Sequence, residues 1–195
     1  MSIIKVFTDC HLFGPHEINV DWEDTAFGED CYDLGDNIDI RGCKPKDLNY
    51  AKKVHNIIID TFWMRKVWGN HELDFCPDYA RVVNYLKINK NTLLTHGDFL
   101  FWGHEKASKY RQLKPASGSF LKRAWVWLVF KQLAKIFDVG VSKQFRDNCI
   151  YTAMLFNVEH IICSHIHPRK RIDLQFGRLR VTILPRGKSE VEIND

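Results

Sequence analysis

Five short apolar segments of this chain each end in a group of polar side chains, and this recurrence limits the fold more than any other feature. The segments have the length and the apolar, β-branched content of strands. In open α/β sheets, ligands bind beyond the carboxyl ends of the strands. Polar groups far apart in the chain can therefore meet at one edge of a sheet. The five groups are Asp9-Cys10-His11, Gly35-Asp36-Asn37, Gly69-Asn70-His71-Glu72, His96-Gly97-Asp98 and Ser164-His165-Ile166-His167.

The remaining pattern alternates helices with these strands and predicts an α/β fold. Strands are expected at 3–8, 31–34, 65–68, 92–95 and 160–163, and a closing hairpin at 171–176 and 179–184. Apolar residues at helical spacing predict a helix over 47–60, and further helices are expected at 79–86 and within 106–157. No repeat or Pro/Gly/Ser-rich linker divides the chain. We therefore expect one domain over 1–195, with a helical insertion at 99–159.

Composition favours a protein of the cytoplasm. No secretory signal opens the chain, and none of the six cysteines forms a C-x-x-C pair, so free thiols are expected. The longest apolar run is only seven residues, at 124–130, whereas a transmembrane helix needs about 20. No transmembrane segment is therefore expected. The net charge of +4 is mild and suits an anionic substrate.

The polar groups supply seven side chains that bind metal ions through nitrogen or oxygen, with no thiolate among them. Such a mixed set suits Mn²⁺, with Fe or Zn²⁺ as alternatives. Two ions about 3.5–4 Å apart form a clamp that is used for phosphoryl chemistry. Two divalent ions, Mn²⁺ first, are therefore the expected cofactors. The predicted ligands are Asp9, His11, Asp36, Asn70, His96, His165 and His167.

The order of these groups resembles the calcineurin-like metallophosphoesterases, whose pattern is D-x-H, G-D, G-N-H-[DE], H and G-H-x-H. The resemblance implies a two-layered β-sandwich flanked by helices, with two metals at its edge. It implies that Asp36 bridges the metals. The sequence departs from the pattern at Ser164, where the family prefers glycine. By position, Asp9, His11 and His167 resemble the ligands of one ion, and Asn70, His96 and His165 those of the other.

The resemblance also implies an enzyme that hydrolyses a phosphate ester or pyrophosphate bond with metal-activated hydroxide. His71 matches the family's non-ligand histidine, which would act as general acid or stabilise charge on the phosphoryl group. A non-enzymatic metal-binding scaffold is the alternative of a different class. Scaffolds with this fold usually lack ligands or the catalytic histidine. Because every such position is filled here, an enzyme is expected.

Two subfamilies offer competing substrates. The block from Gly35 to Gly42 and the G-N-H-E block resemble Ser/Thr protein phosphatases, although Ile40 is an extra residue between Asp39 and Arg41. That family also does not use H-x-H as its last group. A protein phosphatase-like phosphomonoesterase is therefore an alternative, in which Arg41 would contact the phosphate. A surface Arg in a turn explains Arg41 equally well.

The D-x-H-L and L-T-H-G-D blocks, followed by a long helical insertion, resemble UDP-2,3-diacylglucosamine pyrophosphatases. Those enzymes hold acyl chains in a helical cap, for which 119–138 is the candidate here. Its basic stripe carries Arg123 and Trp127, which are candidate substrate contacts. Such a helix packs in a cap or lies at a membrane surface, and simple core packing is the alternative. Those enzymes favour Arg at the position of His71, so this resemblance is partial.

A nucleic-acid or cyclic-nucleotide phosphodiesterase is the third option. Seven basic residues lie in or near the C-terminal hairpin and could guide a phosphate backbone. No nucleic-acid-binding motif supports this interpretation, and a solvated surface is the simpler explanation of the charges. The basic residues are Arg169, Lys170, Arg171, Arg178, Arg180, Arg186 and Lys188.

Overall fold

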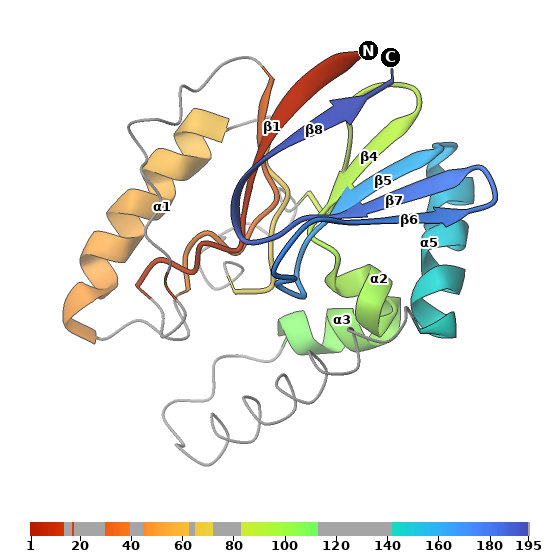
Figure 1. Cartoon of the computed structure of the whole chain (residues 1–195). Helices are drawn as coiled ribbons and strands as arrows, with labels where there is room; N and C mark the ends of the chain where they lie inside the picture. Colours follow the sequence, from red (N-terminus) through yellow and green to blue (C-terminus); the bar gives the residue numbers. More distant parts are fainter. Residues whose placement is uncertain are drawn as a thin grey trace.

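The computed structural model describes residues 1–13, 17, 30–39, 45–62, 65–71, 83–112 and 142–194. Within these residues the chain has the expected α/β fold, with eight strands in two sheets and helices packed outside them (Figure 1). The expected helix over 47–60 is present as a 3-10 turn η1 (Pro45–Asp47) that leads into α1 (Leu48–Phe62). Three further helices follow: α2 (Asp98–Trp102), α3 (His104–Gln112) and α5 (Lys143–Phe156).

The smaller sheet has β1 at its centre. Strand β1 (Ser2–Thr8) pairs in parallel with β2 (Cys31–Asp33) and antiparallel with β8 (Gly187–Ile193). The sequence analysis did not predict β8. Only one face of this edge strand is buried. That face carries Gly187, Val191 and Ile193, and the other positions are charged or polar. Two apolar side chains among charged ones give too weak an alternation to mark a strand.

The larger sheet has the strand order β3-β4-β5-β7-β6, in which β4, β5 and β7 run parallel. Strands β4 and β5 have the predicted bounds, and the predicted hairpin is β6 and β7. The prediction at 65–68 is wrong in extent, because this segment contributes a single bridge between Lys66 and Asp33. The predicted helix at 79–86 is wrong at its end, where Tyr85 and Leu86 belong to a strand; 79–82 lie outside the described residues. The bounds are β3 (Tyr85–Lys87), β4 (Thr92–Thr95), β5 (His160–Cys163), β6 (Ile172–Phe176) and β7 (Leu179–Ile183).

The two sheets pack face to face, because successive side chains of a strand point to opposite sides. Leu94 of β4 and Ile162 of β5 pack against Val6 of β1 and Val191 of β8, and this apolar cluster joins the sheets. The residues one position earlier in β4 and β5 point the other way. The expected two-layered arrangement of sheets is therefore present.

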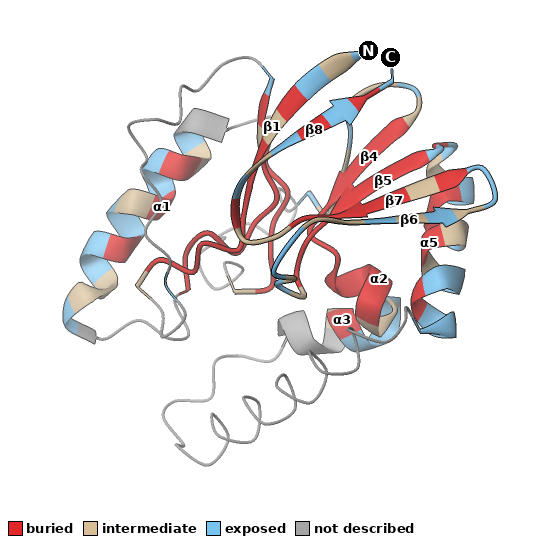
Figure 2. Ribbon diagram, viewed as in Figure 1, coloured by how far each residue is buried: buried red, intermediate tan, exposed pale blue. Residues whose placement is uncertain are grey.

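Helices cover the outer face of each sheet (Figure 2). Ala51 and Ile58 of α1 pack against Phe7 of the smaller sheet. On the larger sheet, Phe101 of α2 stacks on Phe145 of α5, with ring centroids 4.3 Å apart, and both belong to the cluster over β4, β5 and β7. The described elements therefore form four layers in the order helix, sheet, sheet, helix.

The predicted insertion at 99–159 includes α2, α3 and α5, whereas the candidate cap helix at 119–138 lies outside the described residues. None of the described helices is both long and apolar enough to cross a lipid bilayer. Four of the six cysteines are described; each is buried and carries a free thiol. They are Cys10, Cys31, Cys149 and Cys163.

Candidate metal centre

Parallel strands bring the predicted ligands to one edge of the molecule. Asp9 and Asp36 follow β1 and β2 of the smaller sheet, and His96 and His165 follow β4 and β5 of the larger one. Backbone hydrogen bonds join these loops, from Asp9 N to Gly35 O at 3.0 Å and from Ser164 N to His96 O at 3.0 Å. The centre therefore lies where the carboxyl ends of strands from both sheets meet.

The backbone of these loops is strained. Seven non-glycine residues among those described have a positive φ, and five of them are predicted ligands. The left-handed conformation is unfavourable for residues with a Cβ atom, and such residues cluster at functional sites. The positive φ angles at these ligands are an observation separate from the sequence motifs, and they also indicate a functional site in these loops. The φ angles are 54° at Asp9, 51° at His11, 54° at Asp36, 79° at His165 and 51° at His167.

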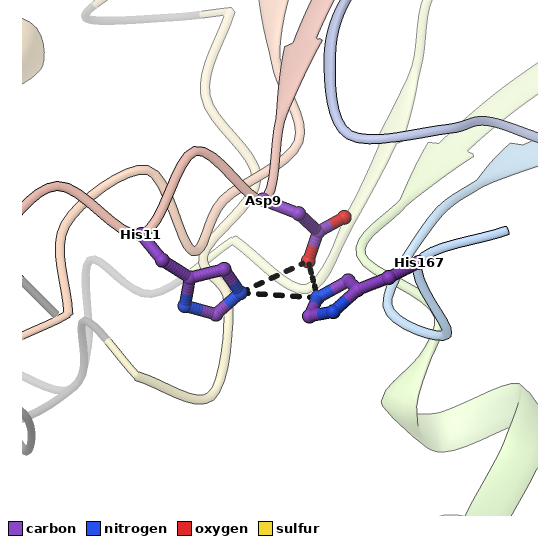
Figure 3. Close-up of side chains that lie close together, drawn as sticks. All are labelled: Asp9, His11 and His167. Carbon is purple, nitrogen blue, oxygen red and sulfur yellow. Dashed lines mark hydrogen bonds and ion pairs between the residues drawn. The ribbon is translucent and has the colours of Figure 1, made fainter. Parts of the chain in front are cut away.

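A first group consists of Asp9, His11 and His167, whose side chains point toward one another (Figure 3). The Nε2 atoms of His11 and His167 are 3.0 Å apart. Asp9 Oδ1 lies 3.1 Å from His167 Nε2 and 3.8 Å from His11 Nε2. Asp9 and His11 are buried, whereas the side chain of His167 is 34% exposed. The group is thus open to solvent at His167.

A second group consists of Asp36, His96 and His165, and Asn70 adjoins it. His96 Nε2 lies 3.1 Å from Asp36 Oδ2, 3.2 Å from Asn70 Oδ1 and 3.1 Å from His165 Nδ1. All four residues are buried. One nitrogen therefore faces three other potential ligand atoms.

The other ring nitrogen of His96 fixes its tautomer. Nδ1 lies 2.9 Å from the carbonyl oxygen of Leu34, which can only accept, so Nδ1–H donates. In the neutral ring, Nε2 then carries a lone pair that is directed at the other side chains of the second group. Metal-binding histidines commonly hold their second ring N–H on a carbonyl or carboxylate in this way.

Charge in the centre favours a cation. Burial alone would raise the pKa of a carboxyl, yet His167 lowers that of Asp9 and His96 lowers that of Asp36, both well below the usual range. Burial opposes protonation of His96, but the neighbouring Asp36 raises the His96 pKa to about 10. Buried carboxylates need a compensating positive charge, which a divalent ion supplies.

The side chains fit a metal ion. Ligand atoms bound to one ion at about 2.0–2.2 Å lie roughly 3 Å or slightly more from each other, as the 3.0–3.2 Å separations in both groups do. Three buried polar atoms of these residues, His11 Nδ1, Asn70 Nδ2 and His165 Nε2, have no hydrogen-bond partner in the described part of the chain. The arrangement brings all seven predicted ligands into two adjacent groups that could hold metal.

Beside the first group, Asp39 holds His71. Asp39 Oδ1 lies 3.2 Å from His71 Nδ1, and Asp39 Oδ2 lies 3.8 Å from His11 Nδ1. Asp39 is buried, whereas the side chain of His71 is 23% exposed and reaches solvent. The sequence motifs assign no role to Asp39, although it belongs to the G-D-N-I-D block. A carboxylate three residues after Asp36 was the available signal.

Two devices hold the loops in place. Thr8 Oγ1 donates to Asp9 Oδ2 at 2.9 Å and lies 2.5 Å from Ser164 Oγ, so Ser164 joins the loops of the two sheets. A Cβ atom on Gly69 would collide with the carboxylate of Asp36. The close approach of Gly69 therefore shapes the Asp36 loop.

The predicted substrate contacts Arg41, Arg123 and Trp127 lie outside the described residues. Part of the predicted basic surface is committed to other groups. Arg171 Nε and Arg180 Nη2 contact the carboxylate of Asp173 at 2.8 and 3.3 Å. Arg186 Nε donates to the carbonyl oxygen of Asp9 at 2.9 Å and so supports the metal centre.

The chain matches no protein-family model and no curated protein. Among solved structures, it is similar to a phosphopantetheinyl hydrolase from Mycobacterium tuberculosis, with 12% sequence identity and a TM-score of 0.38. The match covers 94% of this chain and 89% of that chain. A likeness at this level assigns neither a fold nor an activity.

Proposed function

We propose that this chain is a metal-dependent phosphoesterase that hydrolyses a phosphate ester or pyrophosphate bond. The observation that carries the proposal is the pair of Asp/His groups at one sheet edge, held by residues with left-handed backbone. Nitrogen and carboxylate ligands without thiolate suit Mn²⁺, Fe or Zn²⁺. Such ions polarise a phosphoryl oxygen and make hydroxide available from bound water near neutral pH.

In this proposal, two ions occupy the two groups and Mn²⁺ is the first choice. One ion would be held by Asp9, His11 and His167. Asp36 would contact both ions, because its carboxylate faces the second group while its charge also acts on His11. The other ion would be held by Asn70, His96 and His165.

His71 is the proposed general acid. Its Nδ1 faces Asp39, which leaves Nε2 as the nitrogen that can transfer a proton. The buried carboxylate of Asp39 would favour the protonated ring and fix its orientation, as an acid that protonates a leaving oxygen requires. The backbone N–H of His71 also donates to Asp36 Oδ1 at 2.7 Å, which keeps the acid beside the metal ligands.

The test is turnover of p-nitrophenyl phosphate and of its bis ester by the purified protein with Mn²⁺. We expect His71→Ala to keep its metal content and to lose roughly 10²–10⁴-fold in rate, the usual contribution of general acid–base catalysis. His104→Ala, an exposed histidine at the start of α3, is the matched control. Metal binding without turnover of either ester would favour the scaffold alternative and contradict the proposal.

A further inference from the structure

A cavity of about 240 Å³ lies at the opposite end of the larger sheet from the metal centre. Its lining includes Thr92 and His160, the first residues of β4 and β5. The metal-centre residues His96 and His165 follow the other ends of the same strands. At about 3.3 Å per residue, the cavity is roughly 15 Å from the metal centre. It is therefore a separate site.

The sheet register places four cavity residues in one row. Thr92 pairs with His160, His160 with Arg180, and Arg180 with Gln175. Directly paired residues point to the same face of a sheet. That face is the one toward the smaller sheet, because it also carries Ile162, two residues after His160, in the core between the sheets. The polar side chains of this row therefore lie at one end of the apolar interface between the two sheets.

A buried hydroxyl in this row lacks a partner. Thr92 is 1% exposed, and its Oγ1 makes no hydrogen bond to any residue that the structure describes. An unsatisfied buried hydroxyl is unfavourable by about 1–3 kcal/mol. Thr92 thus forms part of the cavity wall, with its Oγ1 closed off from solvent.

The tautomer of His160 supplies an acceptor. Thr182 Oγ1 donates to Asp173 Oδ1 at 2.7 Å, so it accepts from His160 Nε2–H at 2.9 Å. The neutral ring therefore carries its lone pair on Nδ1. Burial lowers the pKa of His160 to about 4, which keeps this form at neutral pH. Glu159, the residue before His160, also lines the cavity.

Guanidinium groups supply the positive side of the cavity. Arg178 lies in the turn between β6 and β7, is exposed, and has no ion-pair partner within the described ranges. Arg180 carries a contact to Asp173 at 3.3 Å. Guanidinium groups suit phosphate because they donate several hydrogen bonds in one plane. The cavity thus combines phosphate donors with an acceptor for a hydroxyl group.

We propose that this cavity binds a small phosphorylated sugar. Arg178 and Arg180 hold the phosphate, while His160 Nδ1 accepts a hydrogen bond from a sugar hydroxyl. The volume is below the roughly 300 Å³ at which sites for drug-sized ligands begin, so a ligand of pentose-phosphate size fits better than a dinucleotide. The inference is independent of the proposed hydrolysis.

The test is a nuclear magnetic resonance titration of the full chain with ribose 5-phosphate, inorganic phosphate and ribose, in Mg²⁺ rather than paramagnetic Mn²⁺. We expect ribose 5-phosphate to shift the amide signals of Asn91, Glu159 and Gly177 at lower concentration than either fragment does. Arg178→Ala should weaken this binding roughly tenfold or more, the usual effect of a lost charge-assisted hydrogen bond. Arg146→Ala, an exposed arginine on α5, is the matched control.

Shifts confined to the metal-centre amides of Gly97 and Ser164, or equal affinity in Arg178→Ala and wild type, would overturn the proposal. No shift of the cavity amides at millimolar ribose 5-phosphate would overturn it as well.

Discussion

At the scale of single residues, the contact between Asp39 and His71 yields a prediction about catalysis. Asp39→Asn keeps the shape of the side chain but removes the charge that would stabilise a protonated His71. We expect turnover to fall roughly 10–100-fold, which is part of the 10²–10⁴ range of general acid–base catalysis. Metal content should stay at the wild-type value, since Asp39 is not among the proposed ligands. Unchanged turnover in Asp39→Asn would remove Asp39 from the mechanism.

His160 yields a prediction about pH and stability. Its pKa is lowered from 6.5 to about 4 by burial, so between these values the unfolded chain binds more protons than the folded one. The contribution of neutral His160 to the free energy of unfolding is therefore complete above pH 6.5 and is lost as the pH falls through 4. This difference in pKa between the folded and unfolded chain corresponds to about 3 kcal/mol of unfolding free energy.

Urea unfolding of wild type and His160→Gln at pH 7 and pH 4.5 checks this expectation. The glutamine amide can still donate to Thr182 but does not titrate. The free energy of unfolding should fall more steeply with acid in wild type than in the variant. Equal falls would show that His160 is not held neutral by the fold.

At the scale of elements, the segment 65–68, where a strand is predicted, is joined to the end of β2 by a buried ion pair. Lys66 Nζ lies 2.5 Å from Asp33 Oδ2, and Asp33 Oδ1 accepts from Gly35 N at 2.6 Å and from Asn37 Nδ2 at 2.7 Å. The carboxylate at the end of β2 thus holds the loop that carries Asp36. Removing one partner of a buried pair leaves an uncompensated charge, which costs 3–5 kcal/mol.

Lys66→Met is therefore expected to lower the free energy of unfolding by roughly 3 kcal/mol, measured by urea denaturation. Lys52→Met, at an exposed position of α1, is the control and should change little. The double variant Asp33→Asn/Lys66→Met should recover part of the loss, because no lone charge stays buried. A Lys66→Met variant as stable as wild type would mean that Asp33 needs no cation.

The elements also show which parts of the fold the sequence could predict. Strands β4 and β5 are predicted with their bounds because each centres on an apolar pair, Leu93-Leu94 or Ile161-Ile162, and is followed by a histidine group. Strand β8 was missed because it has one buried face with few apolar side chains. The ligands were predicted from local motifs. The bond between Thr8 and Ser164 was not, because it joins residues 156 positions apart that only the packed sheets bring together.

At the scale of the whole molecule, the metal centre connects the two sheets. Asp9 and Asp36 come from the smaller sheet, and His96 and His165 from the larger one, so bound ions would resist separation of the layers. A ligand that binds only the folded state stabilises it by about 2.7 kcal/mol at a concentration of 100 times its Kd. For a chain of this size, that corresponds to a rise in Tm of roughly 5–10 °C.

Thermal unfolding with excess Mn²⁺ and after treatment with EDTA measures this connection. We expect wild type to lose the rise in Tm when the metal is removed. Asp36→Asn should show little rise at any Mn²⁺ concentration, because the variant lacks the carboxylate proposed to contact both ions, while asparagine still accepts the left-handed backbone at φ 54°. Asp147→Asn, at an exposed position of α5, is the matched control and should respond as wild type does. An equal rise in Asp36→Asn would mean that the bound ions do not depend on the Asp36 carboxylate, and the proposal that Asp36 contacts both ions would be wrong.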